Sequence, residues 1–331
     1  MKPSTLDIVA IGNAIVDILA HAEDALIGEL GLVRGGMQLI DAGQAETLYA
    51  RMGQAVEISG GSAANTIAGM ASLGRRCGFI GQVASDQFGK VFSHDIRALG
   101  VEFTTPPRAG DPPTAQCLIF VTPDGQRTMN TFLGASQHLG SGALDRRMIE
   151  DAAILYLEGY LWNADASRDA MAEAIAMAKG AGRRVAFTLS DSFVIHGHRQ
   201  AFLDMMARGE IDILFANENE ILTLTEAPDF EAAVASAAAR VPLLVVTRSE
   251  NGAIAVQHGE RATVAAEPVS RVVDTTGAGD LFAAGFLAGQ AEGRSLHDSL
   301  VMGAVCAAEV ISHMGPRPEA DLRALVGTRL G

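Results

Sequence analysis

Short runs of apolar residues recur along this 331-residue chain. Runs of this length are typical of strands that are buried on both faces of a parallel sheet. Alanine-rich stretches at 168–182 and 229–240 separate the later runs and are typical of helices. This alternation predicts an α/β fold, a doubly wound and mostly parallel sheet flanked by helices, with ligands at the carboxyl edge of the strands. We expect the strands at 7–12, 77–83, 153–159, 184–189, 212–217 and 242–247.

Two segments, at about 14–59 and 104–135, depart from this alternation. The second contains residues 117–132, which are typical of two strands joined by a turn around Pro123–Gly125. β segments that project from an α/β body can form a lid over an active site. We therefore expect one domain over residues 1–331 with a small discontinuous β lid; an ordinary surface hairpin is the alternative.

The composition indicates a well-folded globular protein, because 48% of the residues are hydrophobic and only 19% are charged. No uninterrupted apolar run is long enough for a transmembrane helix, and the N-terminal residues lack a signal-peptide layout. Cys77, Cys117 and Cys306 are widely spaced and form no CxxC pair. We expect reduced thiols in a cytoplasmic protein.

The formal net charge of -14 disfavours nucleic acid or an anionic membrane as the main partner. None of the three lysines lies in a GxxxxGK[ST] pattern, so the chain carries no Walker-type P-loop. No GxGxxG follows the first strand, which argues against a dinucleotide-dependent oxidoreductase. Any nucleotide site must therefore be built in another way.

The segment Asp274–Asp280, with sequence DTTGAGD, reads as a strand end, a glycine turn and the start of a helix. Unpaired N–H groups at a helix N-terminus attract anions, and Gly277, Ala278 and Gly279 would offer such groups as an anion hole. Asp280 could accept the proton of a bound hydroxyl. This combination predicts phosphoryl transfer from a nucleotide to an alcohol; a helix cap with a tight turn is the alternative.

Polar side chains also follow the first strand, where Asn13 and Asp17 are candidates for binding a diol. A turn-forming Asn and a solvent-exposed Asp would be the simpler explanation. Tyr160 follows another strand, where an aromatic face would suit a base, although it could equally be part of the core or rim. His196 and His198 lack further ligands nearby in the sequence, so we expect a surface loop there.

These motifs together resemble the ribokinase-like (PfkB) family of sugar and nucleoside kinases. The heptapeptide matches every fixed position of that family's D-T-x-G-A-G-D signature, with Asp280 as the general base. Gly60 and Gly61, followed by Asn65 on a helix, match the N-terminal signature that binds sugar hydroxyls. Close helix–sheet packing would explain the small residues there, but it explains Asn65 poorly. The resemblance implies the lid described above.

The resemblance also implies binding of ATP with magnesium. Asn217 and Glu220 match an N-x-x-E motif, in which the Glu orders Mg²⁺ through water, although helix capping would give the same spacing. Thr247, Ser249 and Gly252 become candidate ATP contacts, with a plain hairpin turn as the alternative. Asp274 and Thr276 resemble the monovalent-cation loop of some relatives, which would bind K⁺; strand-end capping is equally compatible.

Within the family, the chain is similar to the adenosine kinase branch, through IGNAIVDI, GGSAANT and the segment 123–136. In that branch the Asp matching Asp17 holds the ribose 2′- and 3′-hydroxyls. The resemblance implies phosphorylation of the adenosine 5′-hydroxyl to give AMP, a purine-salvage reaction. A sugar kinase acting on ribose or fructose is the alternative, and a non-catalytic binding protein of the same fold is a further one. The sequence is compatible with a monomer or a homodimer.

Overall fold

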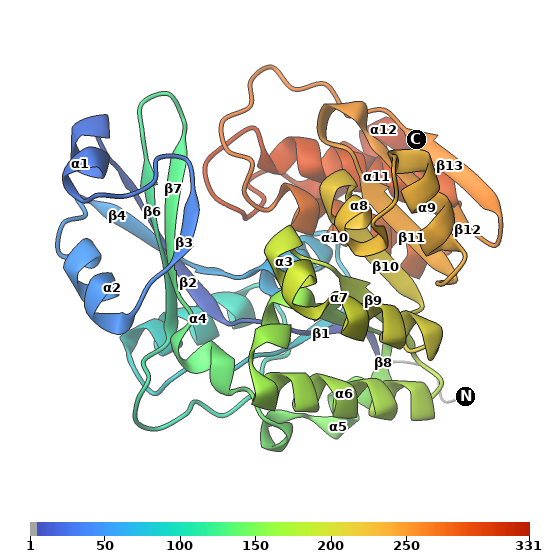
Figure 1. Ribbon diagram of the computed structural model, residues 1–331, viewed down its shortest axis with the longest axis horizontal. Coiled ribbons are helices and arrows are strands. Elements are labelled where there is room, and N and C mark those ends of the chain that lie inside the picture. The colour runs from blue at the N-terminus through green and yellow to red at the C-terminus, as the bar shows by residue number, and fades with distance from the viewer. Residues whose placement is uncertain (1–4) are drawn as a thin grey trace.

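The computed structural model describes residues 5–331. It contains two sheets, and the larger one has eight strands (Figure 1). Its order is β13-β12-β11-β10-β9-β8-β1-β5, and all neighbours are parallel except at β12 and β13. The six parallel strands are those expected from the apolar runs, which confirms the predicted sheet. The strands are β1 (Leu6–Ile11), β5 (Cys77–Ile80), β8 (Ala152–Glu158), β9 (Arg184–Thr188), β10 (Ile213–Asn217), β11 (Leu243–Thr247), β12 (Ala253–Gln257) and β13 (Glu260–Val264).

Helices cover both faces of this sheet because its strands bury side chains on both sides. Ile8 and Ala10 of β1 belong to one core cluster, whereas Val9 and Ile11 belong to the other. The first cluster is closed by α3 (Ser62–Ser72), α4 (Gln87–Ala98), α10 (Ala278–Ala291), α11 (Leu296–Val310) and α12 (Leu322–Leu330). The second is closed by α5 (Arg146–Asp151), α6 (Asp165–Gly180), α7 (Ser192–Ala207), α8 (Glu218–Thr225) and α9 (Phe230–Ala238).

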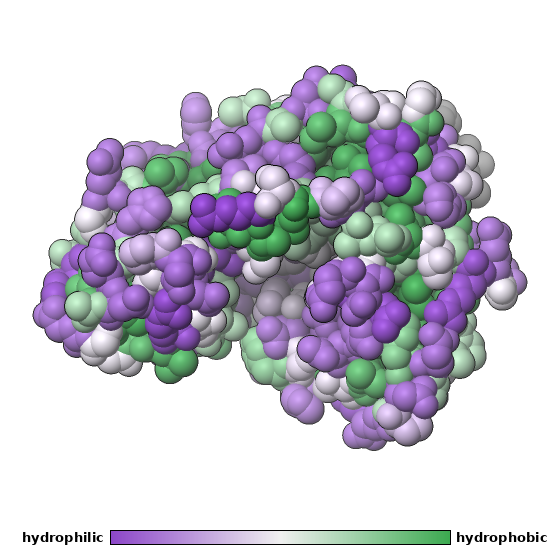
Figure 2. Space-filling view, turned by 90° about the horizontal axis from the view of Figure 1, so that it is seen from above, coloured by the Kyte–Doolittle hydropathy of each residue, from purple (hydrophilic) through white to green (hydrophobic). Residues whose placement is uncertain are grey.

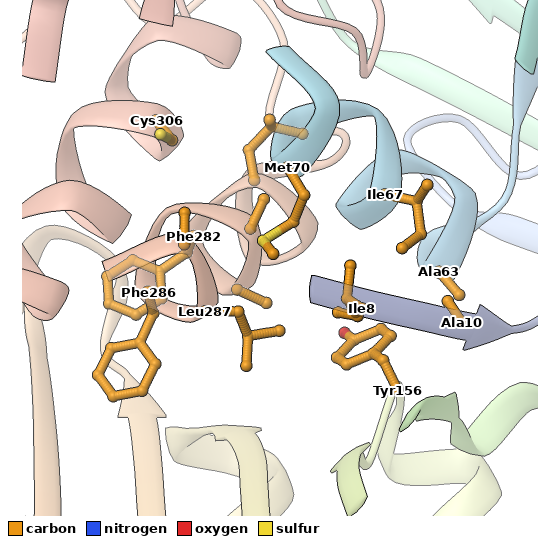
Figure 3. Close-up of a cluster of buried hydrophobic side chains, with 14 of the residues drawn as sticks. Ile8, Ala10, Ala63, Ile67, Met70, Tyr156, Phe282, Phe286, Leu287 and Cys306 are labelled. Carbon is orange, nitrogen blue, oxygen red and sulfur yellow. The ribbon is translucent and has the colours of Figure 1, made fainter. Parts of the chain in front are cut away.

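Small residues let α3 and α10 pack closely over the sheet. Figure 3 shows Ala63 and Ile67 of α3 beside Ala10 and Ile8 of β1, with Phe282 of α10 in the same cluster. At Gly69 of α3 an added Cβ would lie 2.6 Å from a side-chain carbon of Leu281 and 2.7 Å from the Cβ of Ala284. This close contact aligns the first turns of the two helices.

The smaller sheet lies beside the larger one and has the order β3-β7-β6-β2-β4 (Figure 1). Its outer face packs against α1 (Asp24–Glu29) and α2 (Ala42–Tyr49) through Leu118 and Phe120. On the opposite face, Leu19 and Ile119 pack with Met314, which follows α11. These strands fall within the two segments expected to form the lid; their action as a lid stays a prediction. They are β2 (Ile15–His21), β3 (Met37–Leu39), β4 (Ala55–Gly60), β6 (Ala115–Val121) and β7 (Arg127–Phe132).

Two predictions about the fold were wrong. Residues 265–277 contain no strand, so the heptapeptide follows a loop and not a strand end. His196 and His198 lie on α7 and not in a surface loop, and the ring of His198 contacts the Asn163 side chain at 2.8 Å. The predicted 117–132 hairpin is present, as β6 and β7.

Two further expectations concern the cysteines and the membrane. Cys77, Cys117 and Cys306 are all buried and free. Across residues 5–331, none of the helices is both long enough and apolar enough to cross a membrane.

Candidate active site

Asp280 lies in the first turn of α10, where two side chains of α3 hold its carboxylate. Ser62 donates from Oγ to Oδ1 at 2.6 Å, and Asn65 donates from Nδ2 to Oδ2 at 2.9 Å. Burial raises the pKa of Asp280, and these two hydrogen bonds oppose the rise, as does the positive charge of Arg317. The carboxyl group is thus oriented by the helix that follows Gly60–Gly61, with a pKa shifted towards the range useful for a general base.

The N-terminus of α10 presents free backbone donors beside this carboxylate. Gly277, the N-cap, has a left-handed φ of 74°, and an added Cβ would lie 2.9 Å from Pro316. The N–H of Ala278 points at the Thr275 carbonyl at 3.3 Å, whereas those of Gly277, Gly279 and Asp280 have no acceptor in residues 5–331. Space is open above Gly279, because an added Cβ there would meet no atom within 4 Å. The free donors are therefore those of Gly277, Gly279 and Asp280, which include two of the three residues expected to form the anion hole. Their role as an anion hole stays a prediction.

Asn13, Asp17, Gly60 and Gly61 come together where the two sheets meet. An added Cβ would collide with the Asp17 carboxylate at Gly60 and with the Asn13 carbonyl at Gly61, whose φ is 99°. Glycine is therefore required at both positions. Asp17 is buried, whereas the simpler explanation of this residue required a solvent-exposed side chain. Burial raises the pKa of Asp17 to about 7, and the positive charges of Arg317 and Arg127 oppose this rise.

Glu158, at the carboxyl end of β8, is a site residue that the sequence analysis missed. Its carboxylate accepts from the Asn13 backbone N–H at 2.8 Å, from Asn13 Nδ2 at 2.7 Å and from the Ala63 N–H at 2.7 Å. Burial raises its pKa to about 7, and the hydrogen bonds from Asn13 and Ala63 oppose this rise. A carboxylate that ends a buried strand was the signal that could have identified it.

Asn217 and Glu220 form a capping box at the start of α8. The Glu220 N–H donates to Asn217 Oδ1 at 2.8 Å, and the Asn217 N–H donates to Glu220 Oε2 at 3.0 Å. Burial raises the pKa of Glu220 to about 7, and the neighbouring Asp191 and Asp280 raise it further. The capping explanation is therefore observed. It leaves lone pairs on the Glu220 carboxylate, so this oxygen donor set also fits a divalent cation held through water.

The candidate ATP contacts occupy the turn between β11 and β12. Gly252 has a φ of 80° and no room for a side chain against the Val264 carbonyl, whereas Ser249 is exposed. Arg248, between Thr247 and Ser249, does not extend freely: its guanidinium lies 4.0 Å from the centre of the Phe230 ring and 3.0 Å from Glu218. The hairpin turn is thus observed, and contacts with ATP stay a prediction.

Tyr160 lies in the 3₁₀ helix Gly159–Asn163, half-buried, with its ring 6.2 Å from that of Phe193. Burial raises its pKa well above the usual value, and the nearby carboxylates Asp191, Asp280 and Glu220 add to the shift. Because these carboxylates act on Tyr160, the Tyr160–Phe193 aromatic pair lies near the carboxylates of the site.

Asp274 is buried and its carboxylate already has a positive partner from the smaller sheet. Arg127 of β7 approaches Oδ1 with Nε at 2.7 Å, the Thr276 N–H donates to Oδ1 at 2.7 Å and the Gly315 N–H donates to Oδ2 at 2.8 Å. Thr276 Oγ1 is buried without a partner in residues 5–331. One free hydroxyl and a carboxylate neutralised by a guanidinium do not fit the expected monovalent-cation site.

Arg127 nevertheless fits a phosphate group. Its Nη1 is buried and has no hydrogen-bond partner within residues 5–331. Figure 2 shows the molecule hollowed between its two lobes. A guanidinium nitrogen without a partner, and the free N–H groups of Gly277, Gly279 and Asp280, are donors suited to the oxygens of a nucleotide's phosphates.

The fold and the site define a class of protein, a phosphotransferase that uses an alcohol group as acceptor. The model of the pfkB family of carbohydrate kinases matches residues 30–322, and the chain belongs to this family. Membership implies ATP together with a divalent metal ion.

Relatives span nearly the entire chain. The crystal structure of adenosine kinase from Sinorhizobium meliloti is 48% identical, covers 98% of this chain and 100% of its own, and has a TM-score of 0.92. A probable sugar kinase protein from Rhizobium etli CFN 42 is 46% identical, with coverages of 98% and 99% and a TM-score of 0.93. Adenosine kinase from Saccharomyces cerevisiae is 27% identical over 336 residues, which cover 94% of this chain and 96% of its own.

Proposed function

We propose that this protein transfers the γ-phosphoryl group of Mg-ATP to the 5′-hydroxyl of adenosine, giving AMP and ADP. One observation carries the proposal: the Asp280 carboxylate is held by Ser62 and Asn65 and lies next to free backbone donors of the same helix turn. A proton acceptor and an anion-binding site in adjacent positions are what transfer of a phosphoryl group to an alcohol requires.

In this reaction one group of residues binds the acceptor and another binds the phosphates. Asn13, Asp17 and Asn65 bind the ribose hydroxyls and orient the 5′-hydroxyl towards Asp280, which takes its proton as the oxygen attacks the γ-phosphorus. The bond between that phosphorus and the β-phosphate oxygen breaks, and ADP leaves. Backbone N–H groups of Gly277, Gly279 and Asp280, with Arg127, stabilise the negative charge on the transferring group.

The donor side uses the residues around α8 and the β11–β12 turn. Glu220 and Asn217 would hold Mg²⁺ through water, and the ion supplies charge neutralisation of the phosphates when bound. Thr247, Ser249 and Gly252 would contact the nucleotide at the adjacent carboxyl edge of the sheet, where ligands of open α/β sheets bind.

Adenosine as acceptor is supported by the Sinorhizobium meliloti and Saccharomyces cerevisiae relatives. The Tyr160–Phe193 pair offers an aromatic surface suited to a base. A free sugar such as ribose or fructose is the second candidate, favoured by the Rhizobium etli relative. Both acceptors present hydroxyl groups that Asn13 and Asp17 can bind.

The first experiment measures ADP release with adenosine, other nucleosides, ribose and fructose as acceptors. We expect adenosine to give the highest kcat/KM, because only a nucleoside uses both the hydroxyl-binding and the aromatic residues. Preference for a free sugar would establish the second candidate instead. Calorimetric binding of adenosine without any turnover would show a non-catalytic binding protein.

The second arm replaces the base. We expect Asp280→Asn to lower kcat by about 10²–10⁴-fold, because the amide cannot accept the proton, with little effect on folding. Asp298→Asn is the matched control, since Asp298 also lies in the first turn of a helix, α11, and its side chain is 42% exposed. Near-wild-type turnover in Asp280→Asn would contradict the assignment.

A further inference from the structure

We infer that Arg317 is a positioning residue for this reaction: it fixes the turn at Gly60–Gly61, the acceptor-binding turn, against residues 274–277 before α10, the phosphate-binding loop. It also places a positive charge near both Asp17 and Asp280. The inference rests on the proposed function. Arg317 lies in the loop after α11, far in sequence from the residues that it contacts, and no motif of the chain singles it out.

The guanidinium of Arg317 brackets the turn that contains Gly60 and Gly61. Nε and Nη2 donate to the Ser59 carbonyl at 2.9 and 2.6 Å, and Nη2 also reaches Ser59 Oγ at 3.1 Å. Nη1 donates to the Ala64 carbonyl at 2.7 Å. One rigid group thus bridges the end of β4 and the first turn of α3, on either side of the turn. Lysine could not reproduce this planar fork.

The residues just before Arg317 contact the other parts of the site. Met314 packs against the inner face of the smaller sheet. The Gly315 N–H donates to Asp274 Oδ2 at 2.8 Å, and Pro316 lies against Gly277. Four consecutive residues therefore connect the smaller sheet, the phosphate-binding loop and the acceptor-binding turn. Arg317 completes this connection, so its loss should displace the acceptor relative to the donor.

The charge of Arg317 acts on the two carboxylates of the acceptor side. It lowers the pKa of Asp17 and that of Asp280, in both cases against the effect of burial. Burial lowers the pKa of Arg317 itself to about 10, so the group stays protonated at neutral pH. The other charged or titratable groups that interact with Asp17 or Asp280 are Asp274, Cys117, Arg127, Tyr156, Glu158, Tyr160 and Glu220.

Loss of the positive charge of Arg317 should lower the activity most at low pH. A general base works only when deprotonated, and without the charge of Arg317 the pKa of Asp280 rises further. We expect Arg317→Met to move the acid limb of the pH profile of kcat/KM to higher pH by on the order of one unit. The fall in kcat/KM is then largest at low pH.

Arg317→Lys separates charge from geometry, because it keeps the charge and loses the fork. We expect its acid limb to stay at the wild-type pH while the KM for adenosine rises about tenfold. Arg329→Met is the matched control: Arg329 pairs with Glu267 on the surface and its side chain is 55% exposed. This control should keep the wild-type profile.

A measurement without turnover keeps the inference separate from the proposed function. Protein labelled with ¹³C at the aspartate carboxyl carbons is titrated by NMR, with Asp17→Asn and Asp280→Asn to assign the two signals. Arg317→Met should raise the midpoints of both titrations. If the wild type fails to phosphorylate adenosine, the proposed function fails while this titration still tests Arg317.

Two results would overturn the inference. One is an Arg317→Met protein with wild-type carboxyl midpoints and a wild-type acid limb, whatever its thermal stability. The other is an Arg317→Lys protein with an unchanged KM for adenosine. This second test remains possible even if the Arg317→Met protein does not fold. Loss of melting temperature alone, with both properties unchanged, would show that Arg317 serves stability only.

Discussion

Three carboxyl groups of the site, those of Asp17, Glu158 and Glu220, share one physical situation. Each is buried, each accepts hydrogen bonds or faces an arginine, and each has a pKa of about 7 because burial outweighs those favourable contacts. Their protonation therefore changes around neutral pH, far above the usual range of Asp and Glu. Stability near neutrality should depend on pH for this reason.

Glu158 allows a test of this dependence. Its folded-state pKa lies above its unfolded one, so the folded protein binds the proton more tightly. The stability from this group is present below the unfolded pKa and is lost as the pH rises through about 7. Glu158→Gln cannot titrate, so its free energy of unfolding should fall less steeply than that of the wild type between about pH 5 and 8.

The same substitution has a constant cost. At pH 6 most of this carboxyl group is protonated, and its hydroxyl oxygen still accepts a hydrogen bond. The amide nitrogen of glutamine only donates, which leaves the N–H of Asn13 or that of Ala63 without an acceptor. We expect a loss of about 1–3 kcal/mol in urea unfolding at pH 6. Glu173→Gln, on the exposed face of α6, should keep the wild-type slope. Equal slopes for all three proteins would refute the role of Glu158.

The sequence was sufficient for the site residues that lie in local motifs. Asp280, Asn65, Gly60 and Gly61 could be predicted because glycine turns and helix starts leave a pattern within a few residues, and the structure brings them together. Their chemical roles stay predictions. Arg127, Arg317 and Ser62 could not be found, because their significance depends on partners more than a hundred residues away.

Among the elements, the strand β7 and the loop that precedes α10 are joined by the Arg127–Asp274 ion pair. The guanidinium supplies the positive charge that a monovalent cation would supply at Asp274. We therefore expect little cation dependence: replacing K⁺ with Na⁺ or tetramethylammonium at constant ionic strength should change kcat by less than about twofold. ADP release measures this directly.

A strong dependence would contradict that expectation. Activation by K⁺ of about tenfold or more would mean that the ion competes with Arg127 for the carboxylate. Rubidium serves as the companion ion, because its size is close to that of K⁺, and a true cation site would accept both.

The elements that the sequence predicted are those with continuous apolar runs. Strands such as β9 and β11 agree with the expected segments to within a residue or two, because both faces are buried and the run has clear ends. The antiparallel strands β12 and β13 were not predicted. The edge strand β13, Glu260–Val264, has exposed residues and little apolar content. The supposed strand before Asp274 failed for the opposite reason: Val272, although apolar, is exposed in a loop.

At the scale of the whole molecule, segments that contain glycines connect the smaller sheet to the larger one. The chain passes between them at residues 12–14, from β1 to β2, and at Gly60–Gly61, where β4 leads into α3. The expected lid movement has a measurable signature. We expect adenosine with a non-hydrolysable ATP analogue to slow amide hydrogen exchange in β2, β4, β6 and β7 by about tenfold or more.

Helix α6 provides the internal reference, since it packs on the face of the larger sheet away from α3 and α10. Its exchange should change little when both ligands bind. Equal protection of α6 and the smaller sheet would indicate general stabilisation by ligand and would argue against a closing lid.

The contact between α3 and α10 has a consequence for biosynthesis. Ser62 and Asn65 precede Asp280 by 218 and 215 residues, and Arg317 follows Ser59 by 258. The acceptor-binding turn thus leaves the ribosome long before the base and the phosphate-binding loop have been made. A nascent chain can complete the smaller sheet early, yet the proposed site is incomplete until Arg317 has emerged. Chains that end before Asp280 therefore carry the acceptor-binding turn without the proposed base.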